Sequence, residues 1–320
     1  MVSKKIMYNY VICATEYDWY QYMYQEILCK DNVKYYKGID EMLTSTEKKL
    51  YATKLPIKKR IFSKALKRIS FNNENPICFI YFSRFLHTIK EGIVESGRSI
   101  FPNSKHVHFF TDAKNITEEN LQLLRSCMDS IGVYDPSIAD MFNLEFWPNS
   151  FPTLKVSTND DILYDLCFVG NGFDRTEKIE KISEECIRKG LKIAIYLYNV
   201  NAKKRIDGIH YIDNMIPYKD VIEIVKKSRC VLELESKNKK NACSMRTIEA
   251  IVLNKKILTD NINIFNMPCC NENKDNISLF NDITQIDWKF LGNTNTVDYH
   301  YNGEYAAEKF LGRIEISLRA

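Results

Sequence analysis

Short apolar segments alternate with amphipathic helical patterns along most of this chain, and the alternation restarts once, near residue 160. Four apolar segments of the first half have the character of strands: 6–14, 77–82, 106–111 and 131–134. Five segments of the second half have it too: 165–169, 191–197, 209–212, 230–234 and 256–259. Repeated strand–helix–strand units favour right-handed crossovers and a parallel sheet. The sequence therefore predicts an α/β protein with two parallel sheets.

A polar stretch that contains Pro148 and Pro152 separates the two halves, and 320 residues are enough for two domains. We expect a first domain over 1–155, a second over 156–302, and a C-terminal helix in 303–320 that could cross back to the first domain. Ligands of parallel sheets bind beyond the carboxyl ends of the strands. The following loops are therefore expected to line a cleft between the domains: those after Val169, Leu197, Leu234 and Thr259.

Composition narrows the classes of protein that remain. The net charge of +4 does not by itself indicate nucleic acid as a partner. The longest purely apolar stretches, 77–82 and 193–198, are far shorter than the roughly 20 residues of a membrane-spanning helix. The 10 cysteines are scattered without CxxC spacing, which favours small buried side chains with reduced thiols. No apolar core of signal-peptide length is found at the N-terminus, so we expect a cytoplasmic protein.

A glycine-containing turn stands between a predicted strand and a predicted helix at the head of the second domain. It reads Val169-Gly170-Asn171-Gly172, and the helix is expected from about Arg175. Glycines let a backbone approach a phosphate, and the N-terminus of a helix favours anions. The turn is shorter than a full GxGxxG motif, so an ordinary tight turn is the alternative.

A second polar loop leads into the helix that begins near Ser244. Ser244 is a candidate N-cap, and the first turn then carries Arg246 and Thr247. Arg matches phosphate oxygens with its planar fork. Arg246 and Glu249 share a face of this helix, and Glu249 could accept hydrogen bonds from the two ribose hydroxyls of a nucleotide. The alternative is an ordinary Arg–Glu surface pair.

The second half resembles a known domain. The segments DLCFVG, PYKDVIEIVKKSRCVLELE and SMRTIEAIVLNKKILTDN are similar to the C-terminal domain of GT-B-fold glycosyltransferases. The resemblance points to the lipopolysaccharide-core and spore-maturation-type families of bacterial surface-polysaccharide synthesis. CFIYFSRFL, HVHFFTD and YDPSIADMFNLEFWP resemble the N-terminal domain more loosely. The resemblance implies two Rossmann-like domains and a transferase that takes a sugar from a nucleotide diphosphate sugar.

The resemblance implies roles for individual residues. Glu249 would hold the donor ribose, and three residues would lie at or near the diphosphate: Ser244, Arg246 and Thr247. Three residues would form the turn facing the donor: Gly170, Asn171 and Gly172. Tyr198 and Tyr218 could stack on the base or the sugar, or they could pack at a strand end and at a helix start. The loop before the RT-E-A segment departs from the family because it reads NKKNAC, where a glycine is expected.

The leaving diphosphate must be stabilised as its negative charge develops, and GT-B enzymes do this with basic side chains and a helix N-terminus. We therefore expect no metal and no cofactor. His106 and His108 alternate along a strand without an evident third ligand, so we expect them in the core or on the surface.

An inverting enzyme also needs a base from the N-terminal domain. The candidates are Asp112, Glu16 and Asp18, with Arg84 as a possible neighbour of Asp112; capping or loop roles are the alternative for each carboxylate. A retaining enzyme would not need this base. Asp135 precedes a proline and a helix, so it is expected to cap that helix.

Residues 47–70 contain nine basic side chains against one acid, Glu47, and have apolar positions at helical spacing. This pattern predicts a basic amphipathic helix that could lie on an anionic membrane surface. The alternative is a helix whose apolar face packs on the first domain. Nucleic acid is not expected because no binding motif accompanies the charge.

The sequence therefore predicts a metal-independent glycosyltransferase that uses a nucleotide-sugar donor. Its acceptor would be a saccharide or a lipid-linked saccharide, and it would work in the cytoplasm, with the option of peripheral contact with the inner face of the membrane. Two alternatives remain open. One is a pyruvyl- or phosphoryl-type transferase on a similar fold, and the other is a non-catalytic protein that binds nucleotide sugars.

Overall fold

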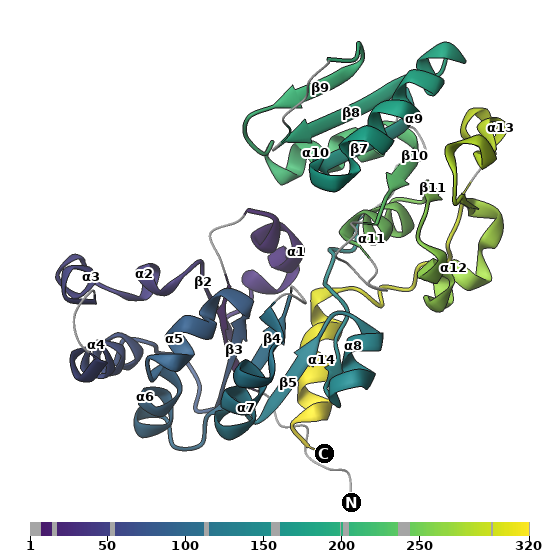
Figure 1. The fold of residues 1–320 in the computed structure, drawn as a ribbon. Coiled ribbons are helices and arrows are strands. Elements are labelled where there is room, and N and C mark those ends of the chain that lie inside the picture. Colours follow the sequence, from purple (N-terminus) through teal and green to yellow (C-terminus); the bar gives the residue numbers. More distant parts are fainter. Residues whose placement is uncertain are drawn as a thin grey trace, which may run out of the picture. The chain divides into compact units, whose positions relative to one another are not determined.

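The computed structural model describes residues 8–14, 18–51, 55–111, 115–154, 161–198, 200, 205–235, 244–295 and 297–319. The chain divides into two compact units (Figure 1). Unit 1 is Met1–Pro152 together with Ala306–Ala320, and unit 2 is Thr153–Tyr305. The C-terminal segment thus belongs to the same unit as the N-terminal half.

Unit 1 is built on a six-stranded sheet, sheet A, with the order β2-β1-β3-β4-β5-β6. Every pairing in it is parallel. Its strands are β1 (Asn9–Cys13), β2 (Val33–Tyr36), β3 (Ile77–Phe82), β4 (Lys105–Phe110), β5 (Ser130–Val133) and β6 (Glu145–Phe146). All six residues of β3 are buried, as the continuous apolar run predicts for a strand covered on both faces.

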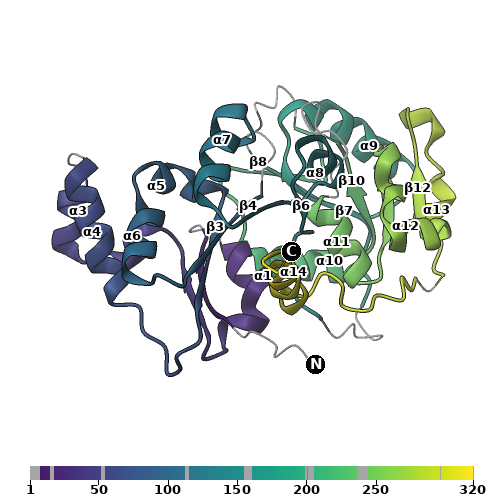
Figure 2. The same cartoon turned by 90° about the horizontal axis from the view of Figure 1, so that it is seen from below.

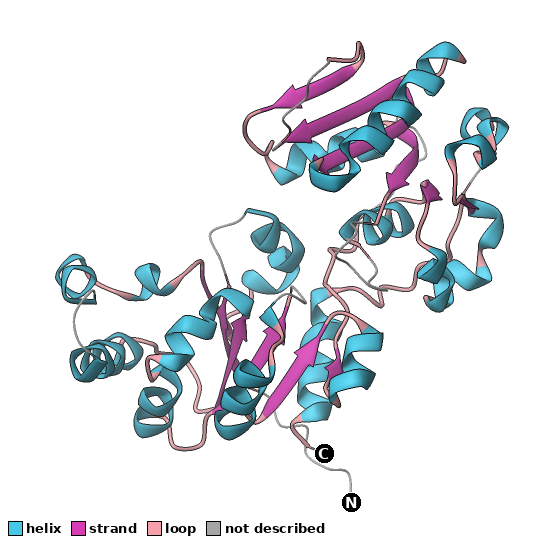
Figure 3. Cartoon of the chain, viewed as in Figure 1, coloured by secondary structure: helices cyan, strands magenta, loops and turns pink. Residues whose placement is uncertain are grey.

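Helices cover the strands of unit 1 (Figure 3). They are α1 (Asp18–Leu28), α2 (Ile39–Met42), α3 (Ser45–Tyr51), α4 (Leu55–Lys67), α5 (Leu86–Lys90), α6 (Ile93–Ile100), α7 (Glu118–Cys127), α8 (Pro136–Phe142) and α14 (Ala307–Ser317). Helix α14 lies beside α1 (Figure 2). Its side chains at 307, 310, 311 and 314 are buried, which is the spacing of one helix face. The C-terminal helix therefore completes the core of unit 1.

Unit 2 contains sheet B, also six-stranded and parallel throughout, with the order β12-β11-β10-β7-β8-β9. Its strands are β7 (Tyr164–Asn171), β8 (Ile193–Tyr198), β9 (Ile209–Ile212), β10 (Ser228–Glu233), β11 (Lys256–Thr259) and β12 (Ile277–Leu279). Numbered within the unit, this is the Rossmann order 3-2-1-4-5-6. The order reverses between β7 and β10, and such a switch point is where ligands of these sheets bind.

The helices of unit 2 are α9 (Thr176–Arg188), α10 (Tyr218–Lys226), α11 (Met245–Val252), α12 (Pro268–Glu272) and α13 (Trp288–Gly292). Helix α9 packs into one core cluster with Leu166 and Phe168 of β7. Cys167 points to the other face of the strand, where Ser228 and Glu249 influence its pKa, which burial raises to about 12. Helices α9 and α11 therefore cover opposite faces of sheet B, as right-handed crossovers on either side of a switch point require.

The segment 47–70 is not one helix. It contains most of α3 and all of α4, with residues 52–54 outside the described part. Four apolar side chains of α4 are buried within unit 1, namely Ile61, Phe62, Ala65 and Leu66, whereas Ile57 near its start is 41% exposed. The expectation of one amphipathic helix is therefore corrected, since most of its apolar face is covered by the unit itself. Residues 85–95 have helical periodicity but do not form one helix, because Gly92 adopts a left-handed φ of 93° between α5 and α6.

Candidate functional site

Arg175 joins the ends of the two strands that flank the switch point of sheet B. It ends a short 3-10 helix, η3 (Phe173–Arg175), between β7 and α9. Its Nη2 donates to the carbonyl oxygen of Asn171 at 2.6 Å, and its Nη1 donates to that of Leu234 at 3.0 Å. Asn171 is the last residue of β7, and Leu234 directly follows β10. The guanidinium is thus fixed at the carboxyl edge of the sheet, between the central strands.

Arg246 places a second guanidinium beside the first. It lies in the first turn of α11, and its Cζ is 4.7 Å from the centre of the buried Phe168 ring. The Cζ of Arg175 lies 5.6 Å from the centre of the same ring. Nη1 of Arg246 is 3.4 Å from the position that a Cβ on Gly170 would take, so the guanidinium lies directly beside this glycine.

The two cations are not neutralised within the described part of the chain. Burial and the charge of Arg246 lower the pKa of Arg175 to about 10, and Asp174 and Glu233 act in the opposite direction. Among the described residues, no carboxylate lies within ion-pair distance of either guanidinium. Two adjacent cations at a strand edge form a binding place for an anion with several oxygens, because the planar fork of Arg matches such groups.

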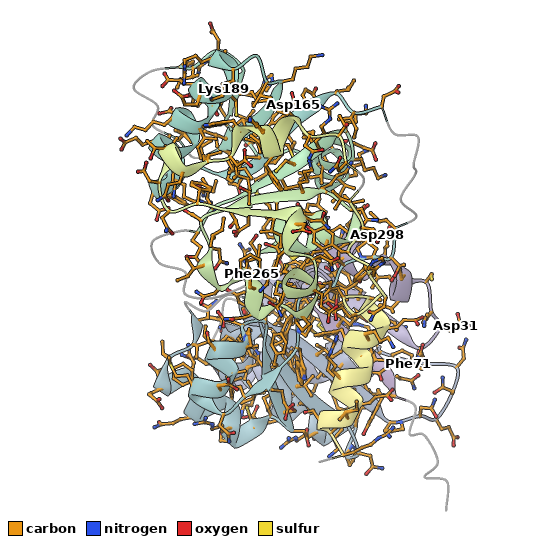
Figure 4. All side chains as sticks on the ribbon, turned by 90° about the vertical axis from the view of Figure 1, so that its right-hand side faces the viewer. Asp31, Phe71, Asp165, Lys189, Phe265 and Asp298 are labelled. Carbon is orange, nitrogen blue, oxygen red and sulfur yellow. The ribbon has the colours of Figure 1, made fainter. Side chains whose placement is uncertain are left out.

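At the opposite, amino-terminal edge of sheet B, a basic side chain has an ion-pair partner. Asp165 and Lys189, both labelled in Figure 4, lie there, at the start of β7 and directly after α9. Arg229 donates to Oδ1 of Asp165 at 2.8 Å, so the charge of Arg229 is paired with that of Asp165. The carboxyl edge, by contrast, holds Arg175 and Arg246, neither of which has an ion-pair partner among the described residues.

Glu249 lies in α11, one turn after Arg246, and is only 3% exposed. Its Oε1 accepts a hydrogen bond of 2.6 Å from the hydroxyl of Tyr218, at the start of α10. Burial raises the pKa of Glu249, while the Tyr218 hydrogen bond and the charge of Arg246 oppose that rise. Tyr218 is itself buried, so it positions Glu249 rather than offering an open ring for stacking.

Four buried polar atoms of this site have no hydrogen-bond partner among the residues that the structure describes. They are Oδ1 of Asn171, Nε of Arg175, Nε of Arg246 and Oε2 of Glu249. Buried polar atoms in proteins are almost always paired, because an unpaired one costs about 1–3 kcal/mol. Their concentration around one switch point indicates a site whose polar groups are meant for a ligand.

The turn after β7 is closely packed around Gly172. Its amide donates to the carbonyl oxygen of Tyr198 at 3.2 Å. A Cβ at this position would lie 2.4 Å from Oγ1 of Thr176 and 2.6 Å from Cγ2 of Val200, so no side chain fits without a shift. Tyr198 is half-buried at the end of β8 and close enough to influence the pKa of Arg175. The expected turn residues therefore do surround the cationic pair.

The start of α11 confirms the expected cap. Oγ of Ser244 accepts a hydrogen bond from the amide of Thr247 at 3.4 Å. Thr247 is 1% exposed, and its hydroxyl lies 3.5 Å from Oγ of Ser244, inside the cap. The structure thus brings most of the predicted donor residues together, since Gly170, Asn171 and Gly172 meet the α11 segment at one edge.

Arg175 was not among the residues expected at the donor. It closes the same turn whose glycines the sequence analysis singled out, and a basic residue at the start of the following helix was the available signal. Its role depends on Leu234, which is 59 positions away in the chain. Only the strand order of the sheet brings these two residues together.

Of the candidate residues of unit 1, the structure describes Asp18 and Arg84. Glu16 and Asp112 are outside the described residues, and Asp18 begins α1. Arg84 is exposed in a short 3-10 helix, η1 (Ser83–Phe85), directly after β3. Sheet A reverses its strand order between β1 and β3, so Glu16 and Arg84 follow the two strands that flank that switch point.

Two other predictions for unit 1 are confirmed. Asp135 caps α8, because its side chain accepts from the amides of Ser137 and Ile138. His106 and His108 are both fully buried in β4. Among the residues that the structure describes, no group of three or more His, Cys, Asp or Glu side chains is placed to hold a metal ion.

Comparisons with known proteins agree on the fold. No protein-family model matches the sequence, and no curated protein matches it. Solved structures do match: both units together are similar to two-domain sugar transferases with Rossmann-like domains, the GT-B class. None of the helices described here is both long and apolar enough to span a membrane.

One such structure is a UDP-forming α,α-trehalose-phosphate synthase from Burkholderia xenovorans. It has a TM-score of 0.54 and 8% identity, over 98% of this chain and 99% of that chain. A crystal structure of TarM has a TM-score of 0.55 and 10% identity, over 82% of this chain and 58% of TarM. A mutant of S. aureus TarM in complex with fondaparinux, α-GlcNAc-glycerol and UDP has a TM-score of 0.52 and 10% identity, over 82% of this chain and 59% of that one. At such identities the likeness shows the fold.

Proposed function

We propose that this protein transfers a sugar from a nucleotide diphosphate sugar to a saccharide acceptor. The observation that carries the proposal is the pair of unneutralised guanidiniums, Arg175 and Arg246, at the switch point of sheet B. The neighbours of similar fold add support, because one is described as UDP-forming and another was crystallised with UDP.

In the proposed reaction, the bond between the anomeric carbon of the sugar and the diphosphate oxygen breaks, and its electron pair leaves with the diphosphate. Arg175 and Arg246 would bind the diphosphate oxygens and stabilise the charge that develops there. The acceptor hydroxyl forms the new bond and loses its proton. Because two side-chain cations supply the positive charge, we propose that the transfer needs neither a metal ion nor a cofactor.

The nucleoside would lie against Glu249. Oε1 is held by Tyr218, and Oε2 has no partner among the described residues, so we propose that Oε2 accepts from a ribose hydroxyl. Replacing Glu249 by Ala should weaken nucleotide binding at least about tenfold, since a hydrogen bond to a charged group is worth about 1.5–3 kcal/mol. Unchanged binding in a folded variant would remove the ribose assignment.

For the acceptor side, we keep Asp112 and Glu16 as candidate bases, with Arg84 near the same edge. An Asp112→Asn variant that loses turnover but keeps donor binding would favour a transferase over a non-catalytic binder. The acceptor class we propose is a saccharide or lipid-linked saccharide of bacterial surface-polysaccharide synthesis, as the sequence resemblance implies. The reaction would then take place in the cytoplasm, at or near the inner face of the membrane.

The cationic pair provides the sharpest test of the proposal. Isothermal titration with UDP, GDP, CDP and uridine would be performed on wild type, Arg246→Met and, as a matched control, Arg188→Met. Arg188 is exposed at the end of α9, at the other edge of the sheet. We expect Arg246→Met to weaken binding of the cognate nucleoside diphosphate about tenfold or more and Arg188→Met to leave it unchanged.

A folded wild-type protein that binds none of these nucleotides would refute the proposal. Measuring sugar transfer with and without EDTA tests whether the reaction needs a metal ion. Complete loss of transfer on chelation would contradict the proposal that it needs none.

A further inference from the structure

Phe173 combines two properties that are costly for an aromatic residue. It is 70% exposed, and its φ of 34° lies in the left-handed region. The other non-glycine residues with positive φ in the described chain are Asn143, Asn254 and His300, which are residue types that tolerate this conformation. A bulky side chain at positive φ is a real outlier, and such outliers gather at functional sites.

Neither the packing nor the turn explains the aromatic ring. An exposed ring contributes little to the core, and a glycine at position 173 would adopt the same φ without strain. The preceding residue, Gly172, is already the position where no side chain fits. The ring is therefore held in the solvent at the cost of backbone strain, two residues before Arg175.

The position of Phe173 relative to the cationic pair follows from the faces of sheet B. Phe173 begins the turn that leads into α9, which covers the face of Phe168. Glu249 belongs to α11, on the face of Cys167. Arg175 and Arg246 lie at the carboxyl edge on the face of Phe168, since both guanidiniums lie over the ring of that residue.

A nucleotide sugar is a linear arrangement of nucleoside, diphosphate and sugar. With the ribose at Glu249 and the diphosphate at the guanidiniums, the group that extends past the phosphates toward the α9 side is the sugar. We propose that the ring of Phe173 stacks against the apolar C–H face of the donor sugar and so discriminates a nucleotide sugar from the free nucleoside diphosphate. This inference rests on the proposed function, because it needs the donor to lie along this edge.

The test compares nucleotides that differ only in the sugar. Binding of UDP, UDP-glucose, UDP-N-acetylglucosamine, GDP and GDP-mannose to the full-length protein would be measured by calorimetry, for wild type and for Phe173→Ala, Phe173→Tyr and Phe173→Gly. Truncating an aromatic stacking platform costs about 1–3 kcal/mol in comparable ring contacts, which is at least fivefold in affinity. For Phe173→Ala we expect a five- to tenfold or larger loss for the cognate nucleotide sugar. Binding of the matching nucleoside diphosphate should stay within twofold of wild type, and Phe173→Tyr should restore the wild-type ratio.

Phe173→Gly separates the ring from the backbone strain. It should lose the same sugar discrimination as Phe173→Ala, while its Tm should equal or exceed that of wild type, by about 2–4 °C if the strain is released in full. Unchanged nucleotide-sugar binding in folded Phe173→Ala, or equal losses for the sugar and the free diphosphate, would overturn the role of Phe173.

The donor site and the stacking role of Phe173 are tested by different variants, so the failure of one can be told from the failure of the other. If Arg246→Met abolishes nucleotide binding but Phe173→Ala changes nothing, only the stacking inference fails. If folded wild type binds no nucleotide of the set, the donor site fails and the stacking inference fails with it.

Discussion

His108 makes the stability of unit 1 sensitive to acid at the scale of a single residue. Neither ring nitrogen has a hydrogen-bond partner, and burial lowers the pKa of the imidazole to about 3. Burial also lowers the pKa of His106 to about 4, although its ring is bonded to Tyr81 and Ser104. An unfolded chain would bind a proton at each histidine near pH 6.5, where the folded state binds none. The two histidines therefore cost no proton-linked stability above about pH 6.5, and below it the free energy of unfolding falls as the pH drops toward 3.

We predict that His108→Leu reduces this acid sensitivity. The substitution removes a buried polar group without partners, so stability at pH 7.5 should be unchanged or higher. Wild type should lose about 1.4 kcal/mol more than the variant for each pH unit below 6.5. Urea unfolding followed by the fluorescence of Trp147, which is buried beside Phe109, measures this at pH 7.5 and pH 5. Parallel losses in the two proteins would show that His108 is not the cause.

The residues of the candidate donor site differ in how well the sequence alone predicts them. The polar types and their spacing around Gly170 and Arg246 were enough to predict one end of the site, because the turn and the N-cap are local features. Arg175 was missed because its partner Leu234 is distant in the chain. The packing of Tyr218 on Glu249 was not predictable either, since it depends on how α10 and α11 meet on one face of the sheet.

At the scale of elements, the buried inner strands could be predicted, whereas most edge strands could not. Ile77–Phe82 and Lys256–Thr259 lie at the predicted positions, because buried parallel strands read as continuous apolar runs. The edge strand Ile209–Ile212 is an exception, since it also lies at its predicted position. The strands β2, β6 and β12 lie at or next to the sheet edges and are short and partly exposed, so their sequences carry little signal. The break at Gly92 depends on a left-handed residue that helical periodicity alone does not reveal.

Helix α14 carries a prediction about the core of unit 1. Phe310 is fully buried and its ring contacts those of Tyr24, Phe82, Phe109 and Trp147. Phe310→Ala should destabilise unit 1 by about 3–5 kcal/mol, because it removes a buried ring and leaves a cavity. Ile316→Ala, on the 68% exposed side of the same helix, should change stability by less than about 0.5 kcal/mol. Equal effects in thermal unfolding would mean that α14 does not complete this core.

The helices α3 and α4 carry a prediction about anionic surfaces. Lys58 is paired with Glu91 and Arg68 with Glu47, whereas four basic side chains of α4 are exposed: Lys59, Arg60, Lys64 and Lys67. Because most of the apolar face of α4 is buried, we expect binding to a membrane to be mainly electrostatic. We predict that wild type binds vesicles rich in anionic lipid and that changing these four residues to Gln weakens binding about 1,000-fold, at about 1 kcal/mol for each charge.

Salt and lipid composition decide the outcome of the vesicle experiment. Binding should fall steeply between low and physiological salt and should be absent with neutral vesicles. As a matched control, Lys181→Gln with Arg188→Gln, on the exposed side of α9, should leave binding unchanged. Equal binding to neutral and anionic vesicles would contradict an electrostatic surface on α3 and α4.

At the scale of the whole molecule, the path of the chain predicts an asymmetry between the two units. Unit 2 is a continuous segment, Thr153–Tyr305, with its own core around Phe168, and all residues proposed for the donor belong to it. Unit 1 is discontinuous, because α14 returns to it after unit 2 is complete. We predict that a fragment of residues 153–305 folds cooperatively and binds the cognate nucleoside diphosphate as tightly as the full chain.

A fragment of residues 1–152 should not fold by itself, because the rings around Phe310 would lose their central partner. Joining residues 306–320 to it through a flexible linker should restore folding, and the same fusion with Phe310→Ala should not. Circular dichroism measures the folding of each fragment, and calorimetry with UDP and GDP measures nucleotide binding. A folded 153–305 fragment that binds no nucleotide, beside a full chain that does, would show that the donor site needs groups from unit 1. The assignment of the whole donor to Arg175, Arg246 and Glu249 would then be wrong.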